Sequence, residues 1–182
     1  MLQITIDGAE CWDEVNEEFV YLKPYTLNLE HSLISLSKWE ARWNKPFLST
    51  KELSFEESID YIKCMTLNPN TPDDIYMRLT QKDISTITDY LSLPMTATWF
   101  SEDKTESKKG PKEVVTAEII YYWMIALNIP PEYKKWHLNR LLTLIRVCNE
   151  KNKPAKPMSR KELMNRNREL NAARKKKYKT KG

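Results

Sequence analysis

The feature that most constrains this fold is a pair of adjacent prolines, Pro130 and Pro131, inside the most apolar stretch of the sequence, residues 114–149. Proline lacks a backbone N–H and disfavours helical conformation in the residue before it, so a helix over Ala117–Asn128 must end there. A second helix can begin at once, because proline is tolerated at the first helical position. The stretch therefore predicts a helical hairpin with one arm on each side of the prolines.

The second arm carries apolar residues around most of its circumference and leaves only a narrow polar stripe through Asn139, Thr143 and Arg146. A helix on the surface of a globular protein usually shows a narrower apolar face. Two interpretations follow: the arm is the central helix of a small bundle, or part of its face receives a helix from another chain. On the second interpretation we expect the partner to contact Trp123, Trp136, His137, Arg140, Leu141 and Leu144.

The N-terminal residues predict a small β-hairpin followed by a helix. Leu2–Ile6 alternates apolar and polar residues and leads into Asp7-Gly8, a turn signal, and a partner strand is expected near Glu18–Leu22. Residues 29–43 place Leu33, Leu36 and Trp39, with Trp43, at three- and four-residue steps, which is typical of a helix. The helix should stop at residues 44–46, which end in proline.

Three further helices are expected before Pro94. Ser54 and Glu57 form a capping box ahead of a helix that turns Ile59, Ile62, Cys64 and Met65 inward. Thr71-Pro72-Asp73-Asp74 combines a cap, a first-turn proline and first-turn carboxylates, and should start a short helix reaching about Leu79. A helix from Thr80 or Gln81 carries Ile84, Ile87 and Leu91. The charged residues 98–113 predict an exposed loop.

The charge of the chain changes sign near residue 150. Residues 1–150 contain 16 Lys/Arg and 23 Asp/Glu, a net charge of −7. Residues 151–182 contain 13 Lys/Arg and 2 Glu, a net charge of +11. We therefore expect a mainly helical α+β domain over residues 1–150, a small bundle with an N-terminal β-hairpin, and a basic tail over residues 151–182. The basic residues singled out in this tail are Arg160, Lys161, Arg166, Arg168, Arg174, Lys175, Lys176 and Lys177.

The tail begins with a linker containing two prolines, residues 151–157, and continues with a second capping box at Ser159–Glu162. Its helix has too thin an apolar stripe to offset the entropy of ordering it alone. Three interpretations stay open: a solvated tail without a dedicated partner, a nucleic-acid-binding arm that attracts phosphates, or an arm that docks on an acidic protein surface, including that of another copy.

The residues required by common enzyme and cofactor sites are missing. Three glycines cannot build a glycine-rich phosphate loop, and two histidines with three scattered cysteines give no spacing typical of metal ligands. His137 and Cys148 are eleven residues apart on one helix, about 16 Å, which is too far for a catalytic pair. We expect His137 to be a core or interface histidine that donates to a carbonyl, Cys148 to be buried, and the protein to have neither catalytic activity nor a cofactor.

The number of cysteines also indicates the cellular compartment of the protein. An odd number of separated cysteines argues against a disulfide framework and favours a reducing interior, so we expect a cytoplasmic protein. The longest apolar run, residues 119–127, is shorter than the roughly 20 residues that a membrane-spanning helix needs. No membrane association is therefore expected.

Two blocks of the sequence support a resemblance, WMIALNIPPEYKKWHLNRLLTLIRVCN and, after it, MSRKELMNRNRELNAARKKK. Together they resemble the C-terminal half of small proteins encoded among the structural genes of tailed bacteriophages, some of which are called tail assembly chaperones. The similarity covers roughly residues 115–182. It lies on Trp123, Asn128, Pro130, Trp136, His137, Leu138, Asn139, Arg140, Leu141 and Leu142, then on the capping box at Ser159–Glu162 and on residues 165–174.

The resemblance implies a protein of the host cytoplasm that keeps the long tape measure protein, or another tail protein, soluble during assembly. It also implies that there are no catalytic residues. A permanent component of the virion, or a host-interaction protein of the same phage, would show the same sequence features. The sequence leaves these alternatives open, together with self-association and with nucleic-acid binding by the tail.

Overall fold

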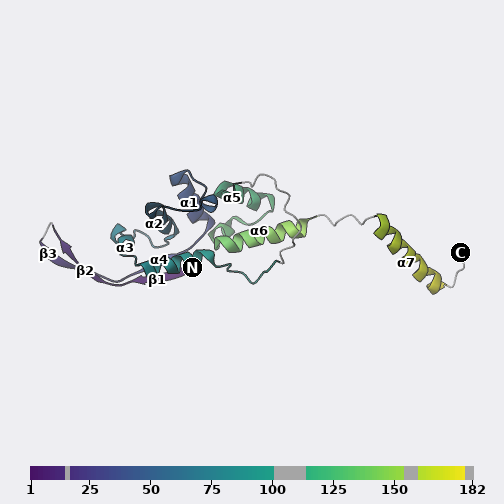
Figure 1. Ribbon diagram of the computed structural model, residues 1–182, viewed down its shortest axis with the longest axis horizontal. Helices are drawn as coiled ribbons and strands as arrows, with labels where there is room; N and C mark the ends of the chain where they lie inside the picture. The colour runs from purple at the N-terminus through teal and green to yellow at the C-terminus, as the bar shows by residue number, and fades with distance from the viewer. Residues whose placement is uncertain (15–16, 101–113, 154–159, 179–182) are drawn as a thin grey trace. The chain divides into compact units, whose positions relative to one another are not determined.

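A computed structural model describes residues 1–14, 17–100, 114–153 and 160–178. The protein is mainly α-helical with a small β component, as the sequence predicts (Figure 1). It divides into two units, Met1–Asn149 and Glu150–Gly182. None of the described helices is both long and apolar enough to cross a lipid bilayer.

The elements follow one another from four strands to a series of helices. They are β1 (Leu2–Ile6), β2 (Ala9–Asp13), β3 (Glu18–Leu22), β4 (Tyr25–Leu29), α1 (Leu33–Trp43), η1 (Phe47–Ser49), α2 (Phe55–Met65), α3 (Asp73–Met77), α4 (Gln81–Ser92), α5 (Ala117–Ala126), η2 (Pro131–Lys135), α6 (Leu138–Asn152) and α7 (Arg160–Tyr178).

The strands pair differently from the sequence prediction. β1 pairs with β4, and β2 with β3, each antiparallel, so the predicted pairing of β1 with Glu18–Leu22 is wrong. The error arose at Asp7-Gly8, because the chain does not reverse there but continues into β2. The reversal falls between β2 and β3, where residues 15 and 16 lie outside the described part. The predicted helix from Leu29 also begins later, at Leu33, because residues 25–29 form β4.

Most of the predicted helix boundaries are confirmed by their capping contacts. Ser54 and Thr80 each form a capping box, and Asn44 ends α1 in the left-handed conformation with φ of 52°. Thr71 does not cap α3, since its hydroxyl donates to the carbonyl of Asn68 instead, and Pro72 is the residue before the helix. The predicted loop at residues 98–113 lies mostly outside the described residues.

The first core lies between the β1–β4 pair and helices α1 to α4. Ile4, Ile6, Leu27 and Leu29 point into it from the strands, and Trp39 enters it from α1. The indole N–H of Trp39 donates to the carbonyl of Glu57 at 2.9 Å, so this large side chain is buried without an unpaired donor.

The second core is built from the other end of α1 together with α5 and α6. Leu33 and Leu36 of α1 pack with Ile120 of α5 and with Leu138 and Leu141 of α6. The buried carboxylate of Glu40 joins the two cores, because its oxygens accept from the amide of Phe47 at 2.9 Å and from that of Ala117 at 2.7 Å. The second bond caps the first turn of α5 from a residue 77 positions away.

The helical hairpin predicted for residues 114–149 is therefore corrected in two respects. The extensive backbone contacts of α5 are with α1 rather than with α6. The residues after Pro130 form the short 3-10 helix η2. Trp136 and His137 are extended, and α6 begins only after them, at Leu138. The prolines do break the first helix, but the second does not start there.

Candidate protein-binding surface

The N-terminal end of α6 is held by residues that precede Pro94 in the sequence. The amide of Leu138 donates to the carbonyl of His31 at 2.7 Å. The side-chain amide of Asn139 donates to the carbonyls of Leu91 and Leu93 at 2.9 and 2.8 Å. These bonds connect α6 to the segment just before α1 and to the C-terminal end of α4. They fix the positions of the neighbouring side chains of Trp136 and Arg140.

Trp136 and Arg140 form a stack with Tyr133 on the surface. The rings of Tyr133 and Trp136 lie 4.0 Å apart and nearly parallel, at 14°. The guanidinium carbon of Arg140 lies 4.0 Å from the centre of the Trp136 ring, which is the geometry of a cation–π contact. Beside the stack lies a hollow of about 210 Å³ that Glu30, Met95 and Lys135 also line. Aromatic and arginine side chains of this kind dominate the energetics of protein interfaces.

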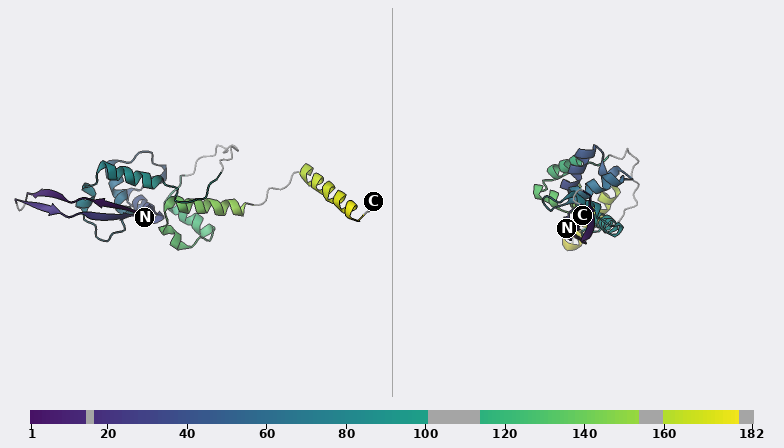
Figure 2. Two further views of the ribbon diagram at one scale, coloured as in Figure 1. Left: turned by 90° about the horizontal axis from the view of Figure 1, so that it is seen from below. Right: turned by 90° about the vertical axis from the view of Figure 1, so that its left-hand side faces the viewer.

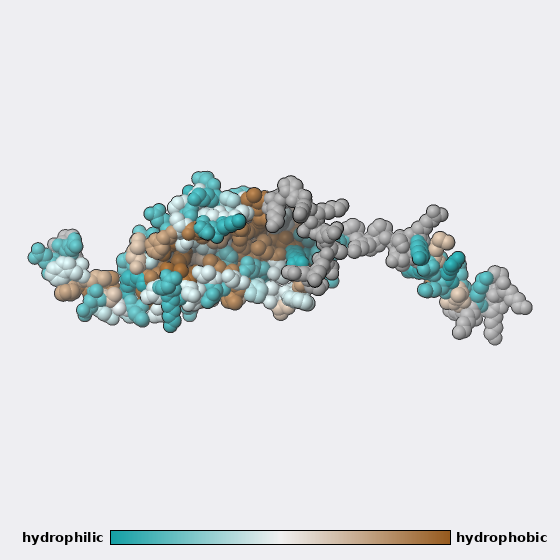
Figure 3. Space-filling model, viewed as in Figure 1, coloured by the Kyte–Doolittle hydropathy of each residue, from teal (hydrophilic) through white to brown (hydrophobic). Residues whose placement is uncertain are grey.

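A second group of exposed apolar side chains lies on α5. Tyr122 is 66% exposed and Ile125 is 76% exposed, and their three-residue spacing places them on one side of the helix. Figure 3 shows apolar residues gathered on the surface where α5 lies. Sequence reasoning did not single out these two residues, because an arm that is apolar on all sides does not reveal which side the fold leaves open.

The six predicted partner-binding residues divide between surface and interior. Arg140 is exposed, and Trp123, Trp136 and Leu144 are half-buried. Leu141 is fully buried and His137 is 4% exposed, so the prediction that these two face a partner is corrected. The reason is that this side of α6 packs on Leu33 and Leu36 of α1.

His137 belongs to a buried pair of histidines. Its ring lies 5.1 Å from that of His31, and its Nε2 donates to the carbonyl of Tyr90 at 3.2 Å, as the sequence predicts for a core histidine. The Nδ1 of His31 lies 2.6 Å from the hydroxyl oxygen of Tyr61. Burial, together with the nearby His137, lowers the pKa of His31 to about 3, and burial also lowers the pKa of His137. The pair is therefore neutral near pH 7.

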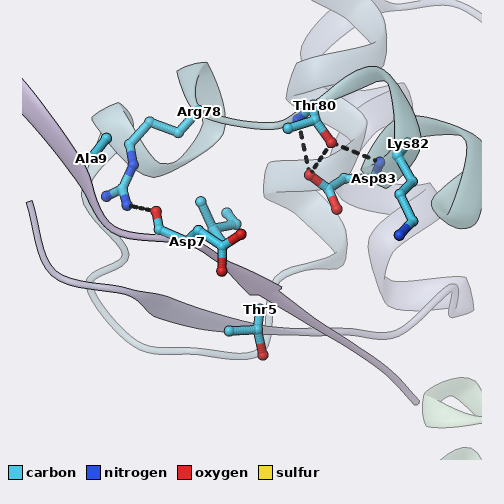
Figure 4. Close-up of a pocket in the computed structure, with 8 residues that line it drawn as sticks. Thr5, Asp7, Ala9, Arg78, Thr80, Lys82 and Asp83 are labelled. Atoms are coloured by element: carbon cyan, nitrogen blue, oxygen red, sulfur yellow. Dashed lines mark hydrogen bonds between the residues drawn. The ribbon is translucent and has the colours of Figure 1, made fainter.

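A further hollow, of about 560 Å³, lies where the ribbon of strands meets α3 and α4 (Figure 4). Arg78, only 12% exposed, donates from its guanidinium to the carbonyls of Asp7 and Lys23. Asp83 accepts from both the amide and the hydroxyl of Thr80. The hydrogen bonds of Arg78 and Asp83 are therefore contacts within the fold. Within the described residues there is no cluster of metal-binding side chains.

A smaller apolar hollow of about 250 Å³ lies between α1, α2 and α3. Phe55 and Met77, both well exposed, line it together with Trp43. Sequence reasoning did not identify it, since its residues come from three separate helices and no local pattern connects them.

The basic residues of the tail lie on α7, which belongs to the second unit. Lys161, Arg166, Arg168, Arg174 and Lys175 are all exposed. The side chains of Arg160, Lys176 and Lys177 lie outside the described part, as does Ser159 of the predicted capping box. Cys148, expected to be buried, is half-buried against the second core.

Comparison with protein-family models, with curated protein sequences and with solved structures finds no match.

Proposed function

We propose that this protein is a bacteriophage tail assembly factor that binds a structural protein, such as the tape measure protein, during assembly. The observation that carries the proposal is the exposed apolar side of α5, formed by Tyr122 and Ile125. A helix that leaves large apolar side chains in water has a surface suited to the apolar face of another helix. The resemblance of residues 115–182 supplies the class of partner.

The Tyr133–Trp136–Arg140 stack supports the same proposal. Its members are held in place before any partner arrives, because Trp136 is sandwiched between a ring and a guanidinium. Side chains that are already ordered lose little conformational entropy on binding. Lys135, which lines the neighbouring hollow and is exposed, supplies a positive charge for a polar rim.

Co-expression with the tape measure protein tests the proposal. We expect the wild-type chain to increase the soluble fraction of the tape measure protein and the double variant Tyr122→Ser/Ile125→Ser to lose most of this effect. Met77→Ser is the control, because Met77 is equally exposed but lies on α3. If the double variant protects the tape measure protein as well as the control does, α5 is not the binding surface.

A structural role in the virion is the first alternative, since a component of the particle also needs exposed apolar surfaces. Quantitative mass spectrometry of purified particles separates the two roles. An assembly factor should be absent from the particles, whereas a structural component should be present at a fixed copy number.

Nucleic-acid binding through α7 is the second alternative, favoured by its five exposed Lys and Arg side chains. Such binding would weaken steeply with salt, because bound counterions are released from the phosphates. Deleting residues 151–182 should abolish it. Absence of DNA and RNA binding by the full chain at low salt would exclude this function.

A further inference from the structure

The β2–β3 ribbon stands apart from both cores. In Figure 1 and in the left view of Figure 2 it extends beyond the helices of its unit, and none of its described side chains is buried. An isolated two-stranded ribbon is only marginally stable in water, because it buries too little apolar surface. Yet its exposed residues are large and apolar.

One face of the ribbon is aromatic. The register pairs Trp12 with Phe19 and Glu10 with Tyr21, so these four residues share a face. Trp12, Phe19 and Tyr21 are 52%, 74% and 60% exposed. The Trp12 and Phe19 rings meet edge to face with their centres 5.0 Å apart, which orders both in advance of binding.

Gly8 contributes to this face through its missing side chain. A Cβ atom at Gly8 would lie 2.7 Å from the Tyr21 ring and 3.0 Å from the carbonyl oxygen of Leu22. Glycine therefore leaves room for the Tyr21 ring to lie over the backbone at position 8. The aromatic face thus consists of the Trp12–Phe19 pair and, beyond Glu10, the Tyr21 ring.

The charge of the ribbon has a single sign. Residues 9–22 contain five acidic residues and no basic residue, namely Glu10, Asp13, Glu14, Glu17 and Glu18. A partner for this surface needs apolar side chains for the aromatic strip and positive charges for the acidic residues around it. Nucleic acid is excluded as that partner because its phosphates would be repelled.

Helix α7 carries both the apolar side chains and the positive charges that such a partner needs. Residues 160–178 contain eight basic and two acidic residues, a net charge of +6. Leu163 and Leu170 are exposed and seven residues apart, so they lie on one side of the helix, and Arg174 continues the same side. From Leu163 to Arg174 the helix rises about 16 Å, close to the roughly 14 Å spanned by a five-residue strand.

We propose that the aromatic, acidic face of the β2–β3 ribbon binds helix α7 of a second copy of this chain. Leu163 and Leu170 cover Trp12 and Phe19, and the arginines of α7 lie against the acidic residues. The donor and acceptor surfaces differ, so the contact is heterologous and each copy keeps one surface open for the next. The inference does not depend on the proposed function.

Sedimentation velocity with the nuclease-treated full chain, over a range of concentrations at low and high salt, tests the proposal. We expect self-association that weakens with salt, because the facing charges are at the surface. Phe19→Ser/Glu10→Lys in the ribbon and Arg166→Glu/Arg174→Glu in α7 should each raise the apparent Kd by about tenfold or more. Met77→Ser/Asp89→Lys is the control, since it makes the same types of change at exposed positions off the ribbon.

Mixing the ribbon variant with the α7 variant tests directly whether these two surfaces bind each other. Each variant keeps one intact surface, so an equimolar mixture should form a heterodimer that grows no further, although each variant alone is monomeric. Circular dichroism and thermal unfolding of every variant check that the fold is intact.

Three results would overturn the proposal. The first is a chain that is monomeric at every concentration at low salt, which includes docking of α7 within its own chain. The second is self-association that neither double variant weakens. The third is a mixture of the variants that remains monomeric while both are folded.

Discussion

The two halves of the β-ribbon show how similar strands acquire different roles. Both are antiparallel pairs of five-residue strands, and both contain large apolar residues. In β1–β4 the helices cover one face, so Ile4, Ile6, Leu27 and Leu29 are buried. In β2–β3 no described helix of the first unit covers the aromatic face, and Trp12, Phe19 and Tyr21 are exposed. The comparison shows that strand pairing alone does not determine whether apolar residues stabilise the fold or remain available to a partner.

The largest expected difference between the two halves is in stability. Leu27→Ala removes a fully buried side chain from the first core and should lower the free energy of unfolding by about 2–5 kcal/mol. Phe19→Ala removes an exposed ring and should cost less than about 1 kcal/mol, mainly its contact with Trp12. Urea unfolding of both variants measures the difference. Equal losses would contradict the view that β2–β3 lies outside the core.

Acid should destabilise the covered half, because His31 lies two residues after the end of β4 and is buried. The pKa of His31 falls from 6.5 to about 3 on folding, so above pH 6.5 it is neutral in both states. As the pH falls from 6.5 toward 3, the unfolded state binds the proton first, and stability decreases by up to about 1.4 kcal/mol per pH unit.

Urea unfolding of the wild type and of His31→Gln at several pH values measures this contribution. The variant should be less stable than the wild type at pH 7, and the difference should shrink as the pH falls. A difference that stays constant between pH 7 and pH 4 would show that His31 does not titrate in this range.

Arg78 joins the two halves, and its loss should have a smaller effect. Arg78→Met leaves the carbonyls of Asp7 and Lys23 without this donor and should cost about 1–3 kcal/mol. Lys82→Met is the matched control, since Lys82 lines the same hollow but is exposed.

Hydrogen exchange locates the effect of Arg78→Met within the molecule. The β2–β3 amides should exchange faster in this variant than in the wild type, while those of α5 should be unchanged. Unchanged exchange in β2–β3 would show that Arg78 does not fix the ribbon.

Local chemistry made much of the helical architecture predictable. The capping boxes at Ser54 and Thr80 and the left-handed stop at Asn44 act within a few residues, so they could be identified without a fold. The inward positions of Ile59, Ile62 and Met65 followed from helical periodicity in the same way. These features determined the fold class and most of the helix boundaries.

The arrangement of the elements was decided by contacts between residues far apart in the sequence. The carboxylate of Glu40 caps α5 across 77 residues, and the carbonyl of His31 receives the amide that opens α6. No local pattern predicts either bond. The prolines at 130 and 131 therefore indicated a break but not that α1, rather than α6, would be the closest neighbour of α5.

The sequence by itself determined that this chain has an acidic helical body and a basic helical tail. Those conclusions rest on composition and short-range spacing. Only the tertiary structure decided which apolar side chains are covered: Leu141 and His137 are buried, whereas Tyr122, Ile125 and the aromatic residues of β2–β3 are exposed. The physical reason is that hydrophobicity drives burial without specifying the partner, and the packing of distant elements decides which face stays open.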